Sequence, residues 1–70
     1  MRNKDAVIIR FLIEHKNEEL NILRISKELR MDYKTAYSIV KRLEKESLVK
    51  LESFGQSNRV KLVFQMHPLI

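Results

Sequence analysis

A line of basic and hydroxyl side chains in the second half of the chain is the arrangement best suited to a chemical role. Lys34, Ser38, Lys41 and Lys45 are spaced by four, three and four residues. Because an α-helix has about 3.6 residues per turn, these side chains would lie along one side of a helix. Lysine ammonium groups neutralise phosphates, so the line is suited to binding a polyanion. The simpler alternative is that it forms the solvated face of a surface helix.

The chain as a whole carries an excess of positive charge. It has 14 Lys+Arg against 9 Asp+Glu, a formal net charge of +5 over 70 residues. Charge of this density suggests nucleic acid or an anionic membrane surface as the partner. The longest apolar stretch, residues 6–13, is interrupted by Arg10 and is much shorter than the roughly 20 residues that span a bilayer. It also lacks the features of a secretory signal. We therefore expect a soluble, cytoplasmic protein that does not bind membranes.

Residues for catalysis or metal binding are scarce. The chain has no cysteine, which excludes disulfides and thiolate zinc sites and fits a reducing cytoplasm. Its only glycine, Gly55, cannot make a glycine-rich phosphate loop, and His15 and His67 are not spaced as a metal pair on one helix. The adjacent Glu18 and Glu19 fall in a loop-like segment and are expected to be solvated. We expect no catalytic residue, no metal and no cofactor, and hence no enzyme.

Apolar residues recur with helical periodicity over the first two thirds of the chain. Each helical stretch follows an Asn or an Asp, whose side chains cap helix N-termini by accepting a backbone hydrogen bond. In the third stretch the apolar face falls opposite the lysine line, on Ala36, Ile39, Val40 and Leu43. We expect helices over residues 4–16, 22–30 and 33–46, with Asn3, Asn21 and Asp32 as their N-caps.

After the third helix the apolar period changes to two. Val49 and Leu51 alternate with polar residues before a turn-forming segment at residues 54–58, and Val60 and Leu62 do so after it. Two such runs around a Gly, Ser and Asn turn predict a β-hairpin. A chain of this length has room for a single core. We expect an α+β fold that is mainly α, with three helices and a C-terminal β-hairpin in a single domain over residues 1–70.

Two segments carry a family resemblance. Residues 25–36, ISKELRMDYKTA, resemble the helix-turn-helix of prokaryotic transcription regulators, in which a small residue in the second helix, here Ser26, lets the third helix cross closely. Residues 41–49, KRLEKESLV, resemble the end of the recognition helix and the start of the wing, and residues 54–59, FGQSNR, would be the wing tip. The resemblance is to the winged helix-turn-helix superfamily of DNA-binding domains, and it covers nearly the whole chain.

Two positions depart from the pattern of that superfamily. The turn between the second and third helices often carries Gly where this chain has Arg30, and the third helix commonly ends in Gly where this chain has Ser47. A left-handed conformation at Ser47 would cost roughly 1 kcal/mol or more relative to Gly. The fold could absorb that cost, so the departures concern the geometry of the turns more than the architecture.

The resemblance implies duplex DNA binding by a transcriptional regulator. The third helix would enter the major groove, which is about 12 Å wide, and the hairpin would lie on the backbone or in the minor groove. The first turns of a recognition helix reach base edges, whereas later residues meet phosphates. We expect base contacts from Tyr33, Lys34, Thr35, Tyr37 and Ser38, phosphate contacts from Lys41, Arg42 and Lys45, and wing contacts from Arg59 and Lys61. As alternatives, the tyrosines could be half-buried core residues, and the wing cations could simply charge an exposed hairpin.

Two other functions stay open. Ile9 and Ile13 widen the apolar surface of the first helix, which could therefore face a second subunit or another domain. The chain would then be a protein-interaction or dimerisation module, N-terminal to a larger chain, and the apolar residues 66–70 would lead into a fused second domain. RNA or single-stranded binding would need aromatic stacking platforms, for which Phe54 and Phe64 are thin support. The expected partners are thus double-stranded DNA and, in addition, a homodimeric copy or a fused domain.

Overall fold

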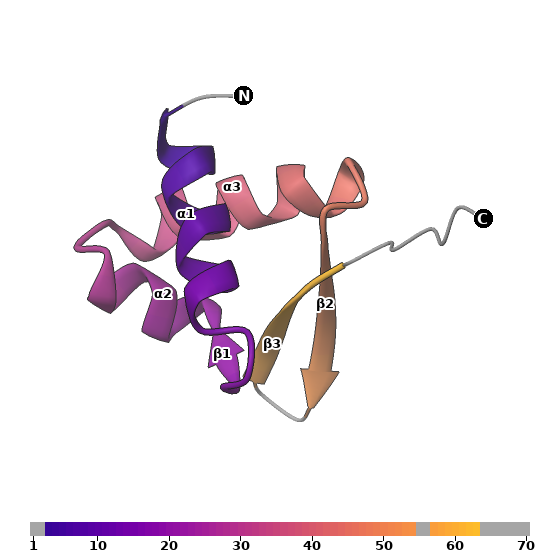
Figure 1. The fold of residues 1–70 in the computed structure, drawn as a ribbon. Coiled ribbons are helices and arrows are strands. Elements are labelled where there is room, and N and C mark those ends of the chain that lie inside the picture. Colours follow the sequence, from indigo (N-terminus) through magenta and orange to yellow (C-terminus); the bar gives the residue numbers. More distant parts are fainter. Residues whose placement is uncertain (1–2, 55–56, 64–70) are drawn as a thin grey trace.

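Residues 3–54 and 57–63 fold into three helices and a three-stranded antiparallel sheet (Figure 1). The computed structural model describes residues 3–54 and 57–63. The predicted order of three helices followed by a hairpin is confirmed, with one short strand in addition. The elements are α1 (Asn3–Glu14), β1 (Leu20–Asn21), α2 (Ile22–Glu28), α3 (Tyr33–Lys45), β2 (Val49–Phe54) and β3 (Ser57–Leu62).

The hairpin strand β3 lies in the middle of the sheet, in the order β1-β3-β2. On one side β2 pairs with it in the register Val49↔Leu62. On the other side β1 pairs with it through Leu20↔Val60. No sequence pattern predicts β1, because two residues are too few to show a period. Through its pairing with β3, this short strand connects the predicted wing to the segment between α1 and α2.

A single apolar core joins the helices to the sheet. The predicted buried face of α3 is confirmed, since all four of its residues are at most 5% exposed. α1 packs against both α3 and β3. The sheet contributes the inward-facing side chains of all three strands. The buried apolar residues are Ile8, Phe11, Leu12, Leu20, Ile22, Ile25, Ala36, Ile39, Val40, Leu43, Val49 and Val60.

The helix starts agree only in part with the predicted caps. Asn21 caps α2 as expected, because its side-chain oxygen accepts a hydrogen bond from the backbone N–H of Arg24 at 2.8 Å. Asp32 occupies the N-cap position of α3, but its side chain makes no capping hydrogen bond. Asn3 is wrong as a cap, since it already lies within α1. Local sequence patterns locate a helix better than they fix its first residue.

The helices also end earlier than predicted, at residues 14, 28 and 45. Several expectations fall on parts of the chain outside the described residues. These are the wing-tip residues Gly55 and Gln56, the aromatic Phe64, and residues 66–70 with His67.

Arg30 and Ser47 adopt left-handed backbone conformations, with φ of 55° and 63°. These are the two positions where the superfamily often carries Gly. Each follows a helix and donates its N–H to a carbonyl of the last turn, Arg30 to Lys27 at 3.3 Å and Ser47 to Glu44 at 2.9 Å. A left-handed residue with a Cβ costs about 1–2 kcal/mol.

The residues after these two positions help to offset that cost. The Met31 N–H bonds to the carbonyl of Ser26 at 2.9 Å, and the Leu48 N–H bonds to the carbonyl of Leu43 at 3.0 Å. Together the two bonds at each helix end satisfy carbonyls that would otherwise lack a partner. Met31 and Leu48 also pack against the core. The chain thus forms two helix C-terminal caps that usually contain glycine with Arg30 and Ser47 in its place.

Replacing Ser47 by Gly should stabilise the domain. Ser47→Gly removes the left-handed strain but adds freedom to the unfolded chain, so the free energy of unfolding should rise by about 0.5–1 kcal/mol in a urea titration. The control is Ser38→Gly, the same change in the middle of α3, which should lower it by a similar amount. Changes of the same sign in both variants would contradict this account.

Candidate nucleic-acid interface

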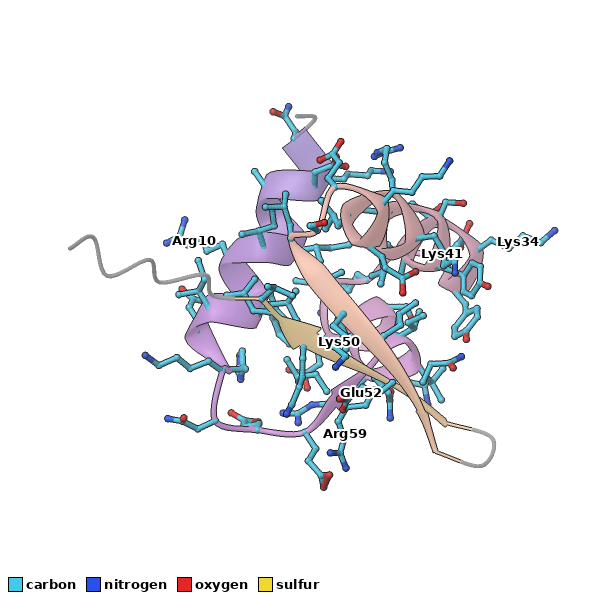
Figure 2. The ribbon with its side chains drawn as sticks, turned by 90° about the vertical axis from the view of Figure 1, so that its right-hand side faces the viewer. Arg10, Lys34, Lys41, Lys50, Glu52 and Arg59 are labelled. Carbon is cyan, nitrogen blue, oxygen red and sulfur yellow. The ribbon has the colours of Figure 1, made fainter. Side chains whose placement is uncertain are left out.

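The side of α3 opposite the core is open to solvent. Because the buried face of α3 is fixed, the predicted line of Lys34, Ser38, Lys41 and Lys45 faces outward, and all four residues are exposed. Lys34 and Lys41 lie on one side of the molecule, and Arg10 of α1 lies on the other (Figure 2). Lys34 and Lys45 have no acidic partner among the described residues. The line is therefore a continuous polar, basic surface on a single helix.

A stacked pair of tyrosines borders this surface at the start of α3. The Tyr33 and Tyr37 ring centroids are 6.3 Å apart, with 27° between the ring planes. The two residues are 44% and 41% exposed, so they are not core residues. A tyrosine ring offers an apolar face and a hydroxyl that can donate or accept a hydrogen bond. The pair could contact both the edge and the methyl group of a base.

The opposite border of α3 faces α1 and carries Thr35 and Arg42. Thr35 is half-buried. The Nη2 atom of Arg42 donates a hydrogen bond to Oδ1 of Asp5 at 2.5 Å. Asp5 is only 3% exposed, and its carboxylate would be costly to bury without this partner. The ion pair links α1 to α3, so Arg42 has a structural contact besides the phosphate contact predicted for it.

Lys41 is partly neutralised by a neighbour on the same helix. Its Nζ lies 3.1 Å from Oε1 of Glu44, one turn further along. The hydrogen bond to Glu44 and its charge raise the pKa of Lys41, so the lysine stays protonated at neutral pH. A phosphate at Lys41 would have to compete with this carboxylate.

The wing cations lie on the outer face of the sheet. Val60 faces the core, so its neighbours Arg59 and Lys61 face away from it. Arg59 stands opposite Glu52 in the register of β2 and β3, and both lie on the side shown in Figure 2. The Arg59 Nη2 atom also donates a hydrogen bond to Glu19, in the loop before β1. Lys61 is exposed. The first of the two predicted wing cations is therefore already paired.

The acidic residues before β1 belong to a network of ion pairs. Glu18 accepts hydrogen bonds from His15 at 2.8 Å and from Arg24 at 2.6 Å, and these contacts lower the pKa of Glu18. Arg24 also donates to Glu28 at 2.6 Å. Glu18 and Glu19 are exposed, as expected, but each is engaged with a cation. Sequence reasoning missed these contacts because some of the partners are far apart in the chain.

Two other kinds of site are absent from the part of the chain that the structure describes. Among residues 3–54 and 57–63, no group of three or more His, Cys, Asp and Glu side chains could hold a metal ion. The ring of His15 packs against Phe11, with centroids 4.3 Å apart. Within the same ranges, no helix has the length and apolar character needed to cross a membrane.

Solved structures with the same fold include a transcription regulator. MepR, a transcription regulator of the Staphylococcus aureus multidrug efflux pump MepA, superposes with a TM-score of 0.83 and 20% identity over 90% of this chain and 47% of its own. A MepR–DNA complex gives a TM-score of 0.84 at 20% identity, over 90% of this chain and 48% of its own. A MarR family protein from Bacillus stearothermophilus gives 0.77 at 21% identity, over 90% and 44%.

These likenesses establish the fold, which is that of a winged helix-turn-helix domain. The predicted fold class is thereby confirmed. The chain spans about half the length of these structures. Comparison of the sequence with protein-family models and with curated proteins gave no match.

Breaking the link between α1 and α3 should destabilise the domain. Asp5→Asn removes the buried charge that holds Arg42, so the free energy of unfolding should fall by about 1–3 kcal/mol in urea. The matched control is Glu14→Gln, which breaks the exposed Arg10–Glu14 pair at 3.4 Å. Exposed pairs contribute about 0–1 kcal/mol, so this variant should be nearly neutral. If both variants unfold at the same urea concentration, the buried pair has no special role.

Proposed function

We propose that this chain binds duplex DNA as the DNA-binding domain of a transcriptional regulator. The observation that carries the proposal is the outward face of α3, where basic and hydroxyl residues lie opposite a fully buried apolar face. An α-helix of this kind fits the major groove of B-DNA. The likeness to regulators, one of them solved with DNA, supports the same function. Such a regulator would act in the cytoplasm and would not be an enzyme.

In this proposal the two ends of α3 have different roles. The first turns of a recognition helix approach base edges, and later turns approach the backbone. The exposed tyrosine pair stands at the first turns, where its rings can reach thymine methyl groups. The proposed base contacts are Tyr33, Lys34, Thr35, Tyr37 and Ser38, and the proposed phosphate contacts are Lys41, Arg42 and Lys45.

The hairpin would add a second set of contacts beside α3. Arg59 and Lys61 would meet the backbone or the minor groove. Arg59 would first have to exchange Glu19 for a phosphate, whereas the exposed Lys61 has no acidic partner among the described residues. The wing should therefore contribute less affinity than its charge suggests.

Protein interaction is the second candidate function, and exposed apolar residues favour it. On α1, Ile13 is 47% exposed and Val7 is 45% exposed, whereas Ile9, the other residue predicted to widen the apolar surface, is half-buried against the core. A second copy of the chain, or a further domain, could cover this helix. Two copies on DNA would read half-sites about one helical turn apart. A chain that dimerises through α1 without binding DNA would favour this second function.

The proposal is tested by the salt dependence of DNA binding. A labelled random-sequence duplex is titrated with the protein and followed by fluorescence anisotropy at several salt concentrations. If about 4–6 phosphates are neutralised, the log–log slope of affinity against salt should be about −4 to −5. No binding even at about 50 mM salt, where non-specific contacts are strong, would contradict DNA binding.

A matched pair of variants locates the binding surface in the same assay. Lys45→Ala removes an exposed charge from the phosphate-contacting end of the proposed surface, and Arg10→Ala removes the same charge from an exposed position on α1. Lys45→Ala should weaken binding by about 10-fold, and Arg10→Ala by much less. Equal losses would show that only the net charge matters.

Removing the carboxylate that holds Arg59 should strengthen DNA binding. In Glu19→Gln the guanidinium of Arg59 loses its ionic contact with Glu19, so affinity at low salt should rise by about 3- to 5-fold. Glu14→Gln makes the same change of net charge on α1, away from the wing, and should raise affinity less. If the two variants gain equally, Glu19 does not compete with DNA for Arg59.

A further inference from the structure

An open hollow of about 480 Å³ lies where the first turn of α1 meets α3. Figure 1 shows the two helices crossing. Lys4 and Asp5 line the hollow from α1, and Lys34, Ser38 and Arg42 line it from α3. The hollow therefore begins at the proposed DNA-binding surface and extends past the edge of α3 onto a second helix.

The charged groups around the hollow are mostly positive. Lys4, Lys34 and Arg42 contribute three positive charges, and Asp5 contributes one negative charge. The Asp5 carboxylate is buried and already holds Arg42 at 2.5 Å. Neither Lys4 nor Lys34 is within ion-pair distance of an acid among the described residues. Two cations without acidic partners thus stand near a guanidinium whose position is fixed.

This combination is suited to a phosphate group. A guanidinium held by one nitrogen still has other N–H donors, and its planar fork matches phosphate oxygens. Lysine adds a mobile point charge, and a hydroxyl adds a neutral donor. The hollow also lies at the N-terminal end of α1, where the helix dipole favours negative charge. Each of these groups acts on an anion placed between the two helices.

We propose that the hollow between α1 and α3 binds a phosphodiester group of duplex DNA, held by Lys4 and Arg42 with Ser38 at its border. The inference rests on the proposed function and extends it, because it adds α1 to the DNA-binding surface. When the outward face of α3 enters the major groove, the edge of α3 that carries Arg42 turns toward one of the strands that border the groove. Lys4 then meets the same strand from α1. Lys4 is thereby an anchor that positions the domain and carries no base preference.

The test compares Lys4→Gln with Arg10→Gln, which each remove one charge from an exposed position on α1. Both are titrated against a labelled random-sequence duplex at several salt concentrations. Lys4→Gln should weaken binding about 10-fold at about 50 mM salt and reduce the magnitude of the log–log slope by about 1. Arg10→Gln should change both values only slightly. Equal effects of the two variants would overturn the proposal.

A second set of variants tests whether Lys4 and Arg42 hold the same phosphate. Arg42→Lys keeps the positive charge but replaces the planar guanidinium group with an ammonium group. Urea unfolding checks that this variant is folded. The Lys4→Gln effect on affinity should be smaller in the Arg42→Lys background than in the wild-type background, because residues that share a partner are not additive. Additive effects would overturn a shared site.

The outcomes of the DNA titrations, together with a titration with inorganic phosphate, distinguish failure of this inference from failure of the proposed function. If wild-type protein binds no duplex, the proposed function fails and this inference fails with it. If the protein binds duplex but Lys4→Gln matches Arg10→Gln, only this inference fails. This inference also fails alone if inorganic phosphate shifts the amide signals of Lys4 and Ser38 while Lys4→Gln leaves the DNA salt slope unchanged. The hollow would then bind small anions but not DNA.

Discussion

Helix α3 has one face that must be buried, and this constraint determines where the polar residues of the helix stand. Its four apolar residues are enclosed by α1, α2 and the sheet. Burying Ile39, Val40 and Leu43 stabilises the fold by about 1.5–3 kcal/mol for each side chain. Rotating the helix by a quarter turn would expose these side chains and lose much of this stabilisation. The loss would be far larger than the stabilisation that a surface ion pair contributes. The basic face of α3 is therefore held outward by the core, and no contact on the basic face itself is needed to orient it.

Arginine and lysine have different places on this domain. Of the five described arginines, Arg10, Arg24, Arg42 and Arg59 pair with acids, and Arg30 takes a left-handed turn. Among the eight described lysines, only Lys41 and Lys50 have an acidic partner within residues 3–54 and 57–63. A guanidinium suits a fixed geometry, whereas a hydrated ammonium on a flexible stem suits a partner that arrives from solution. The arginines mainly join parts of the domain, and the lysines supply most of its unpaired positive charge.

Sequence reasoning predicted those features that repeat within a few residues. The buried face of α3 and the alternation of Val49, Leu51, Val60 and Leu62 are local patterns, and both identified their elements. It missed the contacts that join distant residues, since Asp5 and Arg42 are 37 positions apart and Glu19 and Arg59 are 40 apart. One clue was available for the first pair. Asp5 stands at helical spacing with the apolar Ile8 and Leu12, so it lies on a buried face and requires a partner.

The central position of β3 has a mechanical consequence for the domain. β3 pairs with β2 in the hairpin and also with β1, which leads directly into α2. A hinge at the base of the hairpin would have to break the β1 pairing and pull Val60 from the core. The part of the hairpin nearest the core and the helices that pack against it therefore move as one rigid body. To fit a curved or irregular surface, the domain must tilt as a whole, because the strand pairing at Leu20↔Val60 and Leu51↔Val60 leaves no hinge between the hairpin and the core.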